Sequence, residues 1–154
     1  MKRYEMESDT KLAELRAAAR RAMERAYAPY SGFRVGAAVE TTEGRVHGGC
    51  NVENASFSVT ICAERVAIGA AVTAGGRGLR RVYVCSSSPE PVPPCGVCRQ
   101  ALSEFGADLE VISEGMDGEL RTWTLADLLP EQFRLEDHAS KPEDGSGSGA
   151  EMHP

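Results

Sequence analysis

The stretch "TICAERVAIGAAV", residues 60–72, has two different halves. From Val66 onward it is a run of small apolar residues with the pattern of a buried helix. Just ahead of that run stand a thiol, an acid and a cation, at Cys62, Glu64 and Arg65. Packing alone does not require three such groups at the start of a core helix, so the stretch predicts a structural element and a chemical site together.

Strand-like and helix-like segments alternate on both sides of this helix. Residues 33–52 alternate apolar and polar side chains around the turn "TTEG", which predicts a β-hairpin. Strand–helix–strand alternation after a hairpin indicates an α/β fold in which helices cover a mixed sheet. The remaining predicted elements are helices at 9–27, 62–74, 95–106 and 124–130, and strands at 80–88, 108–113 and 120–124.

The composition of the 154-residue chain, 42% apolar and 26% charged, is typical of one soluble globular domain. The net charge of −6 disfavours binding to polyanions, so we expect no nucleic-acid partner. The sequence has no secretory signal and no apolar run of the ~20 residues that a membrane helix needs. We therefore expect a cytosolic protein without a membrane partner.

Five cysteines in a chain of this kind favour metal binding or catalysis over a disulfide framework. Cys95 and Cys98 form a C-x-x-C pair in "PCGVC", which by itself fits either a redox dithiol or half of a zinc site. Two prolines precede the pair and a predicted helix follows it, so both thiols lie at a helix start, where the helix dipole favours thiolates. Cys62 begins a different helix, and helices that flank one sheet can bring their N-termini together.

Three thiolates with a fourth position open are the pattern of a catalytic zinc site. A structural zinc module would need a fourth protein ligand. Cys50 and Cys85 lie in predicted strands and are interpreted as small buried thiols, while the histidines lie in the hairpin and the C-terminal segment. A purely redox site would need only Cys95 and Cys98, and would leave Cys62 without a role.

Glu64 follows Cys62 by two residues, within reach of the same metal. A carboxylate beside an open zinc position can carry protons to and from a bound water, whereas an isolated Glu at this place would be a dipole contact of ~0.3–1 kcal/mol. Three thiolates overcompensate the charge of Zn²⁺. Arg65 can offset the excess by donating to the sulfurs, and the alternative for Arg65 is a surface ion pair.

Together these residues resemble the small homotetrameric zinc-dependent cytidine deaminases, from about Leu12 to about Phe133. The resemblance is carried by "CNVENASF", "ICAERVAIGAAV", "PVPPCGVCRQALSEFG" and "LLPEQF". It implies a three-layer α/β/α fold with a mixed five-stranded sheet, and the hydrolysis of cytidine or 2′-deoxycytidine to uridine or 2′-deoxyuridine and ammonia in pyrimidine salvage. It also implies one Zn²⁺ per chain, held by Cys62, Cys95 and Cys98, with Glu64 as proton shuttle.

The same resemblance implies a substrate site. Asn51 and Glu53 would bind the ribose 3′-hydroxyl, and Phe33 would pack against the nucleoside. Phe57 and Phe133 would reach the active site of a neighbouring subunit in a homotetramer with shared sites. The side chains of residues i and i+2 of an extended chain point the same way, so Asn51 and Glu53 could bind one hydroxyl together. Without the resemblance, "NVEN" would be read as a polar turn and Phe33 as core.

Two related activities compete with this one. A deaminase of bases in DNA or RNA would need a basic groove and exposed aromatic residues, which the acidic balance disfavours. A branch that deaminates blasticidin S has an altered ribose-binding pattern, whereas "NVEN" is intact here. We expect residues 1–137 to form the catalytic domain, and residues 138–154, which are almost free of apolar side chains, to form a flexible tail.

Overall fold

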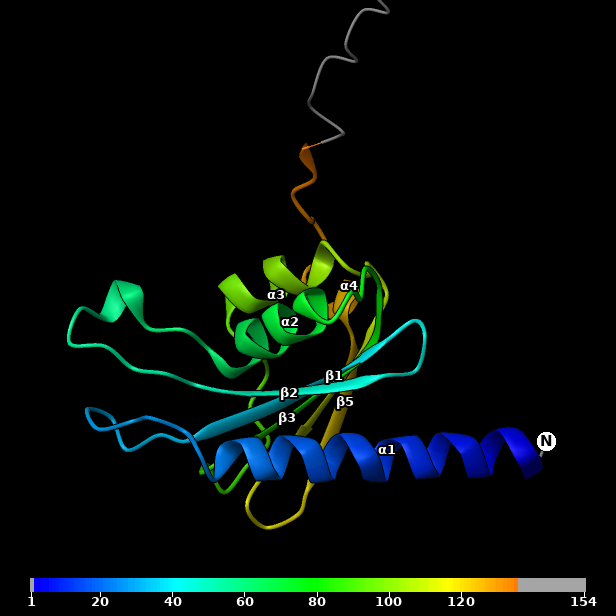
Figure 1. The fold of residues 1–154 in the computed structure, drawn as a ribbon, viewed down its shortest axis with the longest axis horizontal. Coiled ribbons are helices and arrows are strands. Elements are labelled where there is room, and N and C mark those ends of the chain that lie inside the picture. Colours follow the sequence, from blue (N-terminus) through cyan, green and yellow to red (C-terminus); the bar gives the residue numbers. More distant parts are fainter. Residues whose placement is uncertain (1, 136–154) are drawn as a thin grey trace, which may run out of the picture.

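A five-stranded sheet lies at the centre of the structure, a computed structural model that describes residues 2–135 (Figure 1). Its strand order is β2-β1-β3-β4-β5. Strands β3 and β4 are parallel and every other neighbouring pair is antiparallel, so the predicted mixed sheet is confirmed. The strands are β1 (Val35–Thr41), β2 (Val46–Cys50), β3 (Leu79–Ser86), β4 (Glu110–Glu114) and β5 (Leu120–Thr124).

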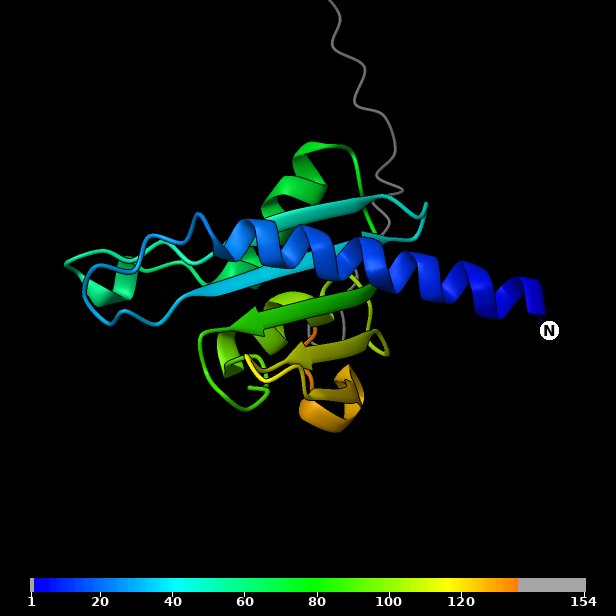
Figure 2. The same cartoon turned by 90° about the horizontal axis from the view of Figure 1, so that it is seen from below.

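Helices cover both faces of the sheet, which confirms the α/β layering. Helix α1 (Lys2–Met23) lies along one face, and α2 (Ala63–Thr73), α3 (Gly96–Ser103) and α4 (Leu125–Leu128) lie on the other (Figures 1 and 2). No helix among residues 2–135 is long and apolar enough to cross a membrane.

Alternation along the strands separates the core into two parts, because successive side chains point to opposite faces. Ala37 and Val39 of β1 face α2, whereas Ala38 faces α1. The larger part, under α2, α3 and α4, also contains Val82, Val84, Val111, Ala63, Ala67 and Leu102. The part under α1 contains Leu15, Ala19, Tyr83, Cys85 and Ile112.

Helix α2 lies almost on the backbone of β2. A Cβ atom built on Gly49 would come within 2.3 Å of the backbone nitrogen of Ala67 and 2.7 Å of the carbonyl oxygen of Ala63. Real Cβ atoms do not approach backbone that closely, so only glycine permits this contact at position 49. The contact fixes the height of the first turns of α2 above the sheet.

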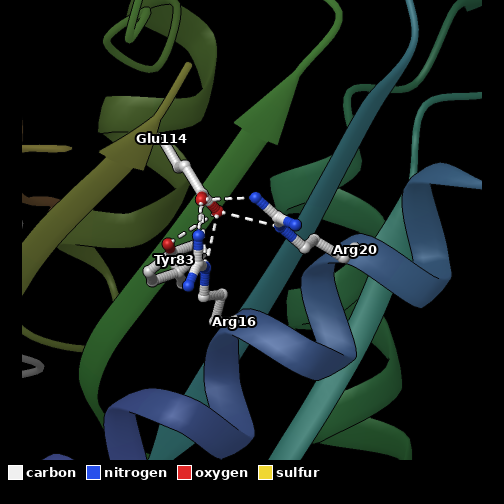
Figure 3. A network of polar contacts seen from close by, with 4 residues as sticks. All are labelled: Arg16, Arg20, Tyr83 and Glu114. Atoms are coloured by element: carbon white, nitrogen blue, oxygen red, sulfur yellow. Dashed lines mark hydrogen bonds and ion pairs between the residues drawn. The ribbon is translucent and has the colours of Figure 1, made fainter. Parts of the chain in front are cut away.

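A cluster of polar side chains around Glu114 joins α1 to the face of the sheet that α1 covers (Figure 3). The Glu114 side chain is 1% exposed, and it accepts hydrogen bonds from Arg16, from Arg20 Nη2 at 2.6 Å and from Tyr83 Oη at 2.8 Å. Burial acts to raise the pKa of Glu114, but these donors outweigh it and lower the pKa to about 2. Nothing in the sequence pattern predicted this cluster.

All four predicted helices have different bounds in the structure. The helix expected at 9–27 runs over Lys2–Met23, because the Tyr27 amide donates instead to the Asn51 carbonyl at 3.0 Å and pairs that segment with the next loop. The helices expected at 62–74, 95–106 and 124–130 are each shorter, because their first residues, Cys62, Cys95 and Thr124, are N-caps with extended backbone. The predicted tail, residues 138–154, and the end of the predicted domain lie outside the described residues.

Candidate active site

Three cysteine sulfurs meet where two helices begin. Cys62 is the N-cap of α2, Cys95 is the N-cap of α3, and Cys98 lies in the first turn of α3. The three sulfurs all lie within 4.8 Å of one another, and the sulfurs of Cys62 and Cys95 are 3.8 Å apart. The sequence predicted this convergence from the two helix starts.

The donor set fits a zinc ion. Tetrahedral ligation with Zn–S bonds of ~2.3 Å separates the sulfurs by about 3.8 Å, which the pair Cys62–Cys95 matches. Among residues 10–135, whose side chains the structure describes, no other group of three His, Cys, Asp or Glu side chains converges in this way. Cys85 is buried in β3, and the Cys50 thiol donates to the Arg25 carbonyl at 3.6 Å, so neither joins the cluster.

The electrostatics of the site favour a thiolate at Cys62. Hydrogen bonds from Cys98, then from Cys95 and Arg65, lower the pKa of Cys62 to about 5 against the opposing effect of burial. The pKa of Cys98 is raised, because its thiol donates to Cys62 and is itself buried. Burial acts to lower the pKa of Arg65, yet the nearby sulfurs of Cys62 and Cys98 outweigh it and raise that pKa. The Arg65 guanidinium also donates to the Thr60 carbonyl at 2.9 Å.

Glu64 is a buried carboxyl at the same helix start. It is the second residue of α2 and only 5% exposed. Burial raises the pKa of Glu64, and the negative charge on Cys62 adds to the rise. A buried carboxyl next to a cluster of metal-binding sulfurs can take up and release a proton during a reaction.

Asn51 and Glu53 lie in the loop after β2, and both side chains are 7% exposed. Asn51 accepts from the Val35 amide at 2.9 Å and donates to the Phe33 carbonyl at 2.8 Å. Glu53 accepts from the Tyr30 amide at 2.8 Å. Both predicted ribose ligands therefore also hold the preceding loop in place.

The two loops lie side by side and lead to the cysteines. Tyr27 pairs with Val52, and Val52 pairs with Ile61, the residue just before Cys62. In Figures 1 and 2 both loops project from the same end of the sheet. Asn51 thus bonds to Phe33, and Glu53 bonds to Tyr30 and Ser31 of the same loop, beside the pairing that leads into α2.

The predicted aromatic residues are all solvent-accessible. Phe33 is 40% exposed, Phe57 68% and Phe133 61%. Phe57 makes an edge contact with Tyr30, with ring centroids 6.2 Å apart, and the Phe133 carbonyl accepts from Gln100 at 2.9 Å. Phe57 and Phe133 are therefore surface residues of the single chain.

A family model described as the cytidine and deoxycytidylate deaminase zinc-binding region matches residues 9–114. The chain belongs to this deaminase family. Its similarity to curated relatives covers most of both chains: it is 42% identical over 125 residues to the cytidine deaminase of Sporosarcina psychrophila, covering 80% of this chain and 92% of that one. It is 44% identical over 117 residues to the cytidine deaminase of Halalkalibacterium halodurans, covering 75% and 89%.

The fold of this deaminase matches solved structures as well. The crystal structure of cytidine deaminase from Burkholderia pseudomallei aligns with a TM-score of 0.75 and 46% identity, covering 79% of this chain and 98% of that one. The zinc-binding region that names the family and the three converging sulfurs agree, so zinc is the cofactor of this deaminase.

Sequence reasoning missed one part of the site, the Tyr30–Ser31 segment that holds Glu53. The partners are 22 and 23 residues apart in the chain, and no motif marks Ser31 as different from any loop serine. Only the folded loops bring the two together.

Proposed function

We propose that this deaminase hydrolyses cytidine and 2′-deoxycytidine to uridine and 2′-deoxyuridine with release of ammonia. One observation carries the proposal: three cysteine sulfurs converge beside the buried carboxyl of Glu64, and no fourth protein ligand joins them among the side chains of residues 10–135. That arrangement is suited to catalysis, because it leaves a coordination position for a reactant and has an acid–base group beside it.

Cys62, Cys95 and Cys98 would hold the zinc. When bound, zinc supplies a Lewis acid that lowers the pKa of a water molecule toward neutrality. Glu64 accepts a proton from the attacking water and delivers it to N3 of the cytosine ring, which makes C4 electrophilic. Glu64 then takes the remaining proton from the hydroxyl on C4 and delivers it to the exocyclic nitrogen. The C4–N bond breaks, and ammonia leaves while the oxygen stays on C4 as the carbonyl of the product.

Arg65 would support the metal ligands. Three thiolates around Zn²⁺ carry a net charge of −1, and the guanidinium beside Cys62 and Cys98 offsets part of it. A less negative site keeps the metal a stronger Lewis acid. Arginine stays charged in proteins, and the nearby sulfurs raise the pKa of Arg65 further.

The nucleoside would bind against the two loops. Asn51 and Glu53 would take the ribose 3′-hydroxyl, and Phe33 would pack against the nucleoside. The support is geometric: both polar side chains are buried, hydrogen-bonded and fixed, which is what a selective hydroxyl site requires.

We further propose a homotetramer with active sites shared between subunits. Phe57 and Phe133 are large apolar side chains with 68% and 61% of their surfaces exposed in the single chain, and exposed aromatic residues are enriched at interfaces. The role would be cytoplasmic pyrimidine salvage of nucleosides, since a reducing compartment keeps all three ligand cysteines as thiols.

An absorbance assay tests the function. Adding cytidine to the zinc-loaded protein should remove the cytosine absorbance band, and a chelator should stop that loss. A denatured sample is the control for uncatalysed hydrolysis. A structural zinc module or a redox dithiol would leave cytidine unchanged, and turnover of a cytosine only within single-stranded DNA or RNA would identify a polynucleotide deaminase instead.

A further inference from the structure

The Ser31 hydroxyl connects two residues of the proposed substrate site. It accepts a hydrogen bond from the Phe33 amide at 3.0 Å and donates one to Glu53 Oε1. The intervening Gly32 has φ of +70°, a left-handed conformation that turns the chain back so that Ser31 can bond to the Phe33 amide. One hydroxyl therefore links the aromatic residue and the carboxylate.

The donors to Glu53 are distributed unevenly over its two oxygens. Oε2 accepts from the Tyr30 amide at 2.8 Å and from the Ser31 amide at 3.2 Å, while Oε1 accepts from the Ser31 hydroxyl. A carboxylate offers about four acceptor sites, two on each oxygen. Oε2 is thus saturated, and the remaining acceptor site is on Oε1, beside the Ser31 hydroxyl.

We propose that Ser31 is a positioning residue for sugar recognition: its hydroxyl holds Glu53 so that the second acceptor site of Oε1 meets a ribose hydroxyl. This inference deepens the proposed function and rests on it. The ligand class is a nucleoside with a free 3′-hydroxyl.

Two observations support an energetic role rather than a passive contact. The Glu53 side chain is only 7% exposed, so a lost donor is not simply replaced by bulk water. The Ser31 hydroxyl is also the main cause of the lowered pKa of Glu53, and an ionised carboxylate is the stronger acceptor for a sugar hydroxyl.

The experiment compares Ser31→Ala and Ser31→Thr with the wild-type enzyme. The readouts are kcat and KM for cytidine, and the inhibition constant of 3′-deoxycytidine, which lacks the hydroxyl in question. We expect Ser31→Ala to raise KM for cytidine about tenfold, with kcat near wild type and the 3′-deoxycytidine constant unchanged. Ser31→Thr retains the hydroxyl and should restore most of the affinity.

Thr73→Ala is the matched control, since it removes an exposed hydroxyl that bonds only within α2, to the Gly69 carbonyl. Melting temperature and zinc content identify a folding defect, and Ser31→Gly provides a second variant without the hydroxyl. If Ser31→Ala weakened the binding of cytidine and 3′-deoxycytidine equally, or of neither, the positioning role would be overturned. Turnover of cytidine by the wild-type enzyme would still uphold the proposed function. A wild-type enzyme that ignores cytidine would remove the function and this inference together.

Discussion

Cys62 and Glu64 are two positions apart in the sequence, yet their side chains serve the site differently. Cys62 precedes the helix with extended backbone and belongs to the sulfur cluster, whereas Glu64 lies inside the helix and is buried. A substitution of Cys62 should remove the metal, whereas a substitution of Glu64 should remove only the proton transfer.

We expect Cys62→Ser to lose most of its zinc, because a neutral hydroxyl replaces a thiolate ligand. The matched controls are Cys50→Ser and Cys85→Ser, whose sulfurs lie outside the cluster and whose zinc content should stay near one ion per chain. Atomic absorption on purified protein measures this directly. Full zinc in Cys62→Ser would rule out the three-cysteine site.

We expect Glu64→Gln to retain zinc and to bind cytidine while turning over more slowly. The amide keeps the shape of the carboxyl but cannot carry a proton, and the loss of general acid–base catalysis alone costs about 10²–10⁴ in rate. One group serves several steps here, so the loss should reach at least the upper end of that range. Zinc content and turnover are measured on one preparation, and a rate above about a tenth of wild type would mean that another group transfers the proton.

At the scale of elements, the height of α2 over the sheet decides where Cys62 and Glu64 lie. That height depends on the backbone contact at Gly49. Helix α3 contributes the other two cysteines, so the site requires both helix starts at fixed places on one face of the sheet.

We expect Gly49→Ala to destabilise the protein by at least about 1–3 kcal/mol, because its methyl group would force α2 away from β2. Zinc affinity should fall as well, since the displaced helix carries Cys62. Gly69→Ala is the control, because its Cβ would meet nothing within 4 Å. Alanine inside a helix should raise the free energy of unfolding by as much as about 1 kcal/mol. Urea unfolding and zinc titration measure the pair, and equal stability of both variants would contradict the close contact.

Helix α1 is held by charge as well as by apolar packing. Glu114 has a folded pKa of about 2 against an ordinary value of 4.5, so it stabilises the fold fully above pH 4.5 and loses that contribution as the pH falls toward 2. The shift corresponds to at most about 3 kcal/mol, reduced by the solvent around the half-exposed arginines.

We therefore expect Glu114→Gln to be less stable than wild type by a gap that is constant between pH 7 and 5 and narrower at pH 3. Urea unfolding of both proteins at these pH values measures the gap. A matched Glu119→Gln variant, at a glutamate outside the cluster, should show no gap that depends on pH in this way. A constant gap down to pH 3 would mean that Glu114 is not held ionised by α1.

At the scale of the whole molecule, the proposed tetramer is tested at Phe133. We expect Phe133→Ala to fold and bind zinc, but to raise KM for cytidine, because its ring would complete the site of a neighbouring subunit. Sedimentation at assay concentration should show a tetramer for the wild-type protein. A wild-type monomer with full activity would contradict the shared site.

How far the sequence predicted the molecule depends on how local each feature is. The sheet, the helices and the three cysteines follow from periodicity, helix starts and motif spacing, each visible within a short window. In the Glu114 cluster, Arg16 and Arg20 lie 98 and 94 positions from Glu114 in the sequence. The Ser31 contact depends on how two loops fold together. Such pairs carry no local signal. The early end of α1 at Met23 was missed for the same reason, since its cause is a contact with Asn51.

Cys62 and Cys95 lie 33 positions apart in the chain, and this spacing has a consequence for folding. A metal bound to both sulfurs closes a loop that runs through α2 and β3, so it acts as a reversible cross-link. In the unfolded chain, closing a loop of that length lowers the conformational entropy. The folded chain has already lost that entropy, so the metal closes the loop there without this cost. The ion should therefore bind the folded enzyme far more tightly than the unfolded chain, and each increase in free zinc should shift the population toward the native state.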